Sequence, residues 1–200
     1  KWGQIISLNY ALNPADENFG HLVSVYGKAY FPGVAKHHSL SFAAVYQTSL
    51  KGFDHEKAIS NLAFHSGRLV PRGFYSSDIE NRNYVATSTN YALPVWYPDL
   101  GCSFIHFKRV RLNLGFDYAS FDHKQMYVNV ADSSVFSKLE RHQIISYGGD
   151  ISIDFNLFRM PAAATTSLTL SIYQPTVLTK HKGDQERRKP FVTVGFGLPF

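Results

Sequence analysis

Apolar and polar residues alternate with a period of two along much of the chain. The clearest stretch is Ile145–Leu157, where apolar or aromatic residues and one glycine take the odd positions and Ser, Asp, Asn or Gly take the even ones. Side chains of a β-strand alternate between two faces, so each such stretch predicts a strand with one apolar and one polar face. The pattern recurs around 3–13, 21–31, 38–48, 85–95, 109–118, 167–172 and 192–200, and no useful length shows a helical period. The sequence therefore predicts an all-β fold with eight strands.

The connections between these strands alternate between long and short from the third onward. Long loops are expected at about 49–83, 121–142 and 176–189, and short turns at 97–101 and 159–162. Transmembrane β-barrels have short periplasmic turns and long extracellular loops. Several stretches alternate for ten or more residues, which is the length that a tilted strand needs to cross a bilayer; strands of soluble sandwiches are usually shorter. An antiparallel transmembrane β-barrel is therefore favoured over a soluble sandwich.

Composition agrees with this interpretation without deciding it. Aromatic residues make up 15% of the chain, and several lie at the ends of the predicted strands, where a membrane-interface girdle would need them. No run approaches 18 apolar residues, which excludes a transmembrane helix. The net charge of +5 is spread thinly apart from a basic cluster at 180–189, so a loop facing solvent or lipid headgroups is favoured over nucleic-acid binding. Cys102 is the single cysteine and cannot form an internal disulfide.

Candidate catalytic chemistry is sparse. The nine histidines are scattered, and His37-His38 lacks Cys or carboxylate neighbours at ligand spacing, so no metal site is expected. Asp150 and Asp154 share one strand face; they could serve acid–base chemistry, but a solvated wall is the favoured interpretation. No glycine-rich loop follows a strand and opens a helix. We therefore expect a non-enzymatic protein without a cofactor.

The last predicted strand ends with Phe196, Leu198 and Phe200 at every second position. This ending resembles the sorting signal of the final strand in bacterial outer-membrane barrels, in which an amphipathic edge strand is available for pairing. The chain opens at Lys1 without a leader, so we expect residues 1–200 to be a single membrane β-barrel segment, the C-terminal part of a longer protein, located in the outer membrane of a Gram-negative bacterium.

The third connection contains Arg72, Gly73 and Phe74, a triplet that resembles the loop motif of the BamA/TamA-type family, the bacterial surface antigen superfamily. In that family the loop folds back into the barrel lumen between strands eleven and twelve of sixteen. Five predicted strands follow the loop here and three precede it, so the resemblance implies that this chain carries strands nine to sixteen. It also implies that the loop at 49–83 lies in the lumen.

The resemblance assigns roles to further residues. Asp117 matches the acidic strand residue that the family arginine contacts, and the alternation independently places Asp117 on the polar side. A second acidic partner on the preceding strand is replaced by Asn90, and Pro71 stands where the family commonly has an aliphatic residue. A guanidinium held by only one carboxylate implies a loop that is fixed less tightly than in the family's insertases.

The family resemblance implies a role in outer-membrane protein assembly and insertion or in protein translocation. Expected partners are outer-membrane lipids, nascent outer-membrane proteins and periplasmic accessory proteins. Two alternatives stay open: a membrane anchor or exporter for an upstream domain, and a closed eight-stranded structural or porin-like barrel, since eight strands can close on their own.

Overall fold

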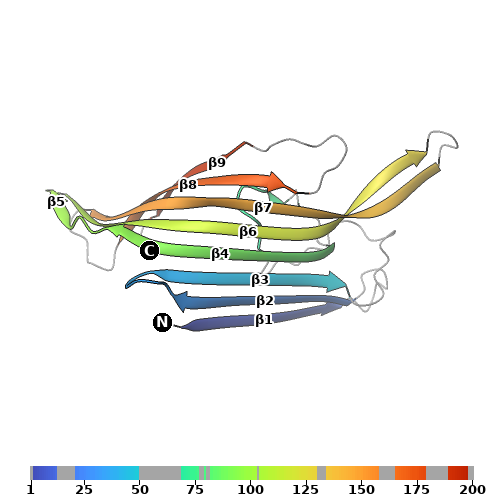
Figure 1. Cartoon of the computed structure of the whole chain (residues 1–200), viewed down its shortest axis with the longest axis horizontal. Helices are drawn as coiled ribbons and strands as arrows, with labels where there is room; N and C mark the ends of the chain where they lie inside the picture. The colour runs from blue at the N-terminus through green and yellow to red at the C-terminus, as the bar shows by residue number, and fades with distance from the viewer. Residues whose placement is uncertain are drawn as a thin grey trace.

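A computed structural model describes residues 2–12, 21–49, 69–76, 79, 82–102, 104–129, 134–157, 165–178 and 189–197. These residues form nine β-strands (Figure 1). The strands are β1 (Gly3–Leu12), β2 (His21–Pro32), β3 (Ser39–Ser49), β4 (Arg82–Trp96), β5 (Leu100–Cys102), β6 (Ile105–Asn129), β7 (Ser134–Leu157), β8 (Thr166–Val177) and β9 (Phe191–Gly197). Among the described residues no helix is long and apolar enough to cross a membrane.

The strands form one antiparallel sheet in the order β1-β2-β3-β4-β6-β7-β8-β9, and the short β5 pairs with the start of β6. The predicted all-β antiparallel fold is confirmed, and the eight long strands are the eight that the alternation predicts. In the described part of the chain β1 and β9 are the two edges, so the sheet is open (Figure 1). The closed eight-stranded barrel that the sequence left as an alternative is therefore not the arrangement in this structure.

The predicted long loop at 121–142 is wrong. β6 continues to Asn129 and β7 begins at Ser134, with continuous pairing from Phe121↔His142 to Asn129↔Ser134. The two strands extend together beyond their neighbours, since β4 pairs with β6 only up to Asp122 and β8 pairs with β7 only from Ile144 (Figure 1). Residues 121–142 show no regular alternation of apolar and polar positions, so this pair lacks the pattern by which the other strands were predicted.

One face of the sheet is apolar and exposed, and we call it the apolar face. Register aligns its side chains in rows across the strands; one row consists of Leu93, Leu112, Ile151, Leu170 and Val194 on β4, β6, β7, β8 and β9. Exposed members of this face on the other strands include Leu8, Val25, Phe42 and Tyr46. Hydrophobic side chains on this face therefore form a continuous surface across the whole sheet.

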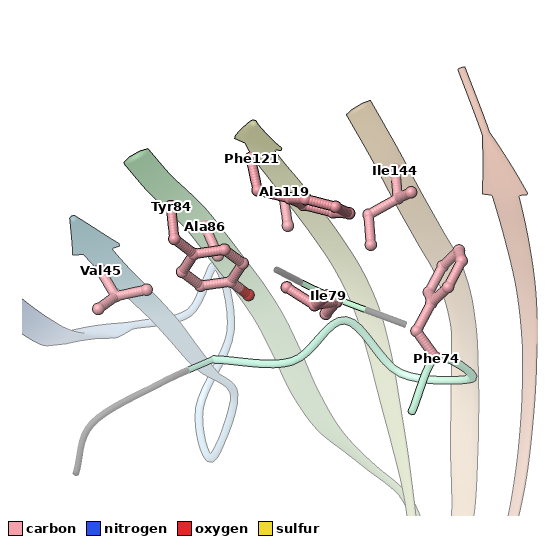
Figure 2. Packing of buried hydrophobic residues seen from close by; sticks show 8 residues of the cluster. All are labelled: Val45, Phe74, Ile79, Tyr84, Ala86, Ala119, Phe121 and Ile144. Carbon is pink, nitrogen blue, oxygen red and sulfur yellow. The ribbon is translucent and has the colours of Figure 1, made fainter. Parts of the chain in front are cut away.

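The opposite face, which we call the polar face, carries most of the buried polar side chains. Residues 69–76 and 79, the crossing segment, lie over this face (Figure 2). A small apolar cluster joins the segment to the strands; it comprises Val45, Phe74, Ile79, Tyr84, Ala86, Ala119, Phe121 and Ile144. The segment thus covers part of the polar face, whereas the apolar face stays uncovered by the described residues.

Candidate functional site

A tight turn at Pro71–Phe74 brings Arg72 down onto the sheet. The Phe74 N–H donates to the Pro71 carbonyl at 3.2 Å, and Gly73 has φ of +85°. This conformation favours glycine, and a Cβ on Gly73 would also lie 3.1 Å from Cβ of Phe191 and 3.2 Å from Cγ of Pro175. Gly73 of the predicted motif is therefore required both by the backbone and by the close approach to β8 and β9.

Arg72 and Asp117 form a three-fold contact. Nε of Arg72 donates to Oδ2 of Asp117 at 2.7 Å, Nη2 donates to Oδ1 at 2.8 Å, and the Arg72 backbone N–H donates to Oδ2 at 3.0 Å. The Asp117 side chain is 5% exposed and that of Arg72 is 26% exposed. The predicted contact between these two residues is present, with the paired geometry that gives the strongest guanidinium–carboxylate bonds.

The guanidinium also contacts β8, a partner that the sequence did not suggest. Nη1 of Arg72 donates to the Tyr173 hydroxyl at 2.6 Å, and its Cζ lies 4.3 Å from the Tyr173 ring centroid. The Tyr173 hydroxyl donates in turn to Asp150 at 2.9 Å, and Asn113 donates to the same carboxylate oxygen at 2.8 Å. Arg72 therefore links the crossing segment to β6 through Asp117 and to β8 through Tyr173, whose hydroxyl extends the network to Asp150 on β7.

Two glycines make room for this network. A Cβ on Gly115 would lie 2.3 Å from Nη2 of Arg72 and 2.5 Å from its Cζ, so the guanidinium rests directly on the β6 backbone. A Cβ on Gly148 would lie 2.7 Å from Cα of Tyr173 and 2.8 Å from its Cδ1. In the sequence these glycines were only small residues on the polar side of predicted strands. Each glycine lies two positions from an aspartate on the same strand face, Gly115 from Asp117 and Gly148 from Asp150. This spacing alone does not predict a close contact with an arginine or a tyrosine.

Asn90 does not contact Arg72 directly. Its side-chain amide donates to Ser88 at 3.2 Å, and the Ser88 hydroxyl donates to Oδ1 of Asp117 at 2.7 Å. Asn90 thus supports the carboxylate through Ser88, one step further away than predicted. Both residues line a cavity of about 200 Å³ between the segment and β4, together with Leu69 and Arg72.

Apolar contacts hold the segment on either side of Arg72. Phe74 is buried in the apolar cluster against β4, β6 and β7 (Figure 2), and the Tyr84 hydroxyl donates to the Leu69 carbonyl. Burial lowers the pKa of Arg72, but the hydrogen bonds and negative charge of Asp117 outweigh it, so the pKa is raised. The guanidinium therefore stays charged, and the arrangement is suited to fixing a loop in place.

The other predicted site residues lie elsewhere. Asp154, considered with Asp150 for acid–base chemistry, instead accepts from Arg109 and Arg111. Phe196 lies on β9 at the apolar face and is 58% exposed, whereas Leu198 and Phe200 lie outside the described residues. No group of three or more His, Cys, Asp or Glu side chains suited to a metal ion occurs in the described ranges.

No protein-family model, no curated protein and no solved structure matches this chain. The family resemblance of the Arg72 motif therefore stays a prediction from the sequence.

Proposed function

We propose that this chain forms part of the wall of a bacterial outer-membrane β-barrel of the surface antigen type. Its role would be non-enzymatic, in the assembly of other outer-membrane proteins or in the translocation of proteins across that membrane. The observation that carries the proposal is the reversal of the two faces: an exposed apolar face that spans the sheet, and a polar face with a loop clamped onto it.

The apolar face has the height that a bilayer requires. On β6 it runs from Phe107, across the bulge, to Tyr118. This path is about 36 Å at roughly 3.3 Å per residue, which corresponds to a height of about 28 Å for a strand tilted by about 40°. An outward apolar band in outer-membrane barrels is about 25 Å tall. Soluble monomers rarely expose apolar patches larger than a few hundred Å², so lipid is the solvent that this face fits.

Aromatic side chains mark one border of this face. They lie at the end of the sheet that carries the turn at residues 33–38, where Trp2 packs edge-on against Phe31 at 5.3 Å between ring centroids. The Phe155 ring centroid lies 6.2 Å from that of Phe107 and 6.4 Å from that of Phe196, in tilted arrangements. Aromatic rings of this kind anchor barrels at the headgroup level.

Polar side chains mark the other border. Two positions beyond Tyr46, Thr48 donates to Asn83 at 2.6 Å, and Asn83 donates to Asp122 at 2.6 Å. Arg141 then donates to Asp122 at 3.0 Å, so the chain of contacts crosses β3, β4, β6 and β7. This ladder lies where the apolar rows end, as expected where strands leave the hydrocarbon for the headgroup region.

The clamped segment favours the surface antigen type over other barrels. A loop folded into the lumen needs contacts with the barrel wall, and each residue of the motif makes one. Arg72 binds a carboxylate, Gly73 allows a close approach to β8 and β9, and Phe74 packs in the apolar cluster. A weakly paired last strand would suit an assembly role, since such a strand can accept an incoming strand by edge pairing. β9 has seven residues and contains Gly195 and Gly197, which weaken a ladder.

Two measurements test the proposal in the organism that makes the protein. Membrane fractionation should place the full-length protein in the outer membrane, and recovery in a soluble fraction would refute the assignment. Depletion should then lower the amounts of many unrelated outer-membrane barrels, measured by quantitative proteomics. Loss of one surface or secreted protein with the other barrels unchanged would instead identify an anchor or a dedicated exporter with the same wall.

A further inference from the structure

A second cluster on the polar face combines two arginines with one carboxylate. Nε of Arg109 donates to Oδ2 of Asp154 at 2.5 Å, and Nη2 of Arg111 donates to Oδ1 at 2.8 Å. The Asp154 side chain is 1% exposed, whereas those of Arg109 and Arg111 are 46% and 44% exposed. Each oxygen of the Asp154 carboxylate thus accepts from one arginine. Two guanidinium charges against one carboxylate leave the cluster with a net charge of about +1.

Comparison with Arg72 shows that the two arginines are incompletely used. Arg72 employs its backbone N–H and three guanidinium nitrogens, and it has a carboxylate of its own. Arg109 and Arg111 each contribute one guanidinium nitrogen to a shared carboxylate. Because a guanidinium carries five N–H donors, most donors of this pair have no acceptor among the described residues and can serve a further one.

The backbone is irregular on both sides of the pair. β6 has a register shift between Phe107 and Arg109, and β4 has one between Pro94 and Trp96. Pro94 is paired with Arg111 and has no N–H for the ladder. Bulges of this kind redirect side chains, and they recur beside functional sites.

Neighbouring strands place short side chains beside the arginines. Ala92 and Pro94 precede the β4 bulge, and Ser152, Ser167 and Thr169 lie on the β7 and β8 side. Hydroxyl groups can add donors to an oxyanion. Asp150, further along β7 toward the crossing segment, accepts from Asn113 and Tyr173 and so belongs to the Arg72 network.

We propose that Arg109 and Arg111 form an oxyanion-binding site, for a phosphate or carboxylate group that bridges the two guanidiniums. Planar guanidiniums bind both groups through paired N–H donors, which a single ammonium cannot do. Asp154 would then act as the element that holds both side chains parallel. This site goes beyond the proposed function, and its test does not depend on it.

Protection from chemical modification tests the site in the unaltered protein. The folded full-length protein in detergent is treated with phenylglyoxal, which modifies accessible guanidiniums, with and without inorganic phosphate at constant ionic strength. Phosphate should slow modification of Arg109 and Arg111 but not of Arg141, a control that is equally exposed and also bound to one aspartate. Equal protection of all three arginines, or of none, would overturn the proposal.

Substitution provides the second test. Arg109→Gln and Arg111→Gln should each weaken phosphate binding in calorimetry by about tenfold, the loss of one charge-assisted contact, while Arg141→Gln should bind as the parent does. Retained affinity in the Arg111→Gln protein would refute the site. Repeating the titration with acetate distinguishes the source of the anion, because tighter phosphate binding identifies a phosphate group and tighter acetate binding a carboxylate.

Discussion

The contact between Arg72 and Asp117 allows a quantitative prediction. Arg72→Ala removes two hydrogen bonds to a carboxylate that is 5% exposed, and leaves it with the backbone N–H of residue 72 and the Ser88 hydroxyl. Breaking a buried ion pair from one side costs about 3–5 kcal/mol. Because the Arg72 side chain is 26% exposed and those two donors remain, we expect a loss of about 2–3 kcal/mol in the free energy of unfolding.

Asp117→Ala should cost about 3 kcal/mol, because it leaves the guanidinium with the Tyr173 hydroxyl as its remaining partner and orphans the residue 72 N–H. The double variant should lose little more than Asp117→Ala alone, since each substitution already breaks the same contact. The coupling energy of the cycle is therefore expected to be about 2 kcal/mol.

Urea unfolding of the full-length protein from lipid vesicles measures these energies. The two tryptophans, Trp2 and Trp96, both lie exposed near the turn end of the apolar face, so their fluorescence should report the loss of lipid contact. Arg141→Ala is the matched control, an arginine bound to an aspartate away from the crossing segment. Losses that add up within about 0.5 kcal/mol in the double variant would show that the two residues act independently and would refute the pairing.

Three further substitutions test other parts of the structure. Gly115→Ala places a Cβ 2.3 Å from the Arg72 guanidinium, so it should cost about 2 kcal/mol in the same unfolding assay and add almost nothing in an Arg72→Ala background; full additivity would contradict the close contact. Tyr173→Phe removes one hydroxyl and keeps the ring beneath the guanidinium, so a loss of about 1 kcal/mol is expected. Leu114→Arg puts a charge in the apolar face and should cost about 2–4 kcal/mol, measured as reduced insertion into vesicles. The control Val34→Arg, in the exposed turn at 33–38, should insert normally. Normal insertion of both variants would argue against lipid at the apolar face.

The two-residue alternation was sufficient to identify the eight long strands and the face to which each side chain belongs. The physical reason is local, because consecutive side chains of a strand point to opposite faces of the sheet. When the two faces differ in polarity, apolar and polar residues must alternate along the sequence. Asp117 was placed on the polar face on this basis. Its contact with Arg72 was expected from the family resemblance, and the need of a buried guanidinium for an acceptor agrees with that expectation.

The alternation failed where no such contrast exists. The β6–β7 ribbon, after Asp122 on β6 and before Ile144 on β7, pairs with no third strand among the described residues, and a loop was predicted in place of these continuous strands. Its pairing depends on the register of the two strands, which only their mutual hydrogen bonds determine.

Contacts across long sequence separations were decided by the tertiary structure alone. Arg72 reaches Tyr173, 101 residues away, because the sheet order brings β8 beside β7 and because Gly115 and Gly148 leave space for the guanidinium and the ring. In the same way, the register of β6 and β7 beyond the bulge at 107–109 brings Arg109 and Arg111 to Asp154. The sequence predicts which side chains share a face of the sheet. Strand register, bulges and the space left by glycines determine which of those side chains are in contact.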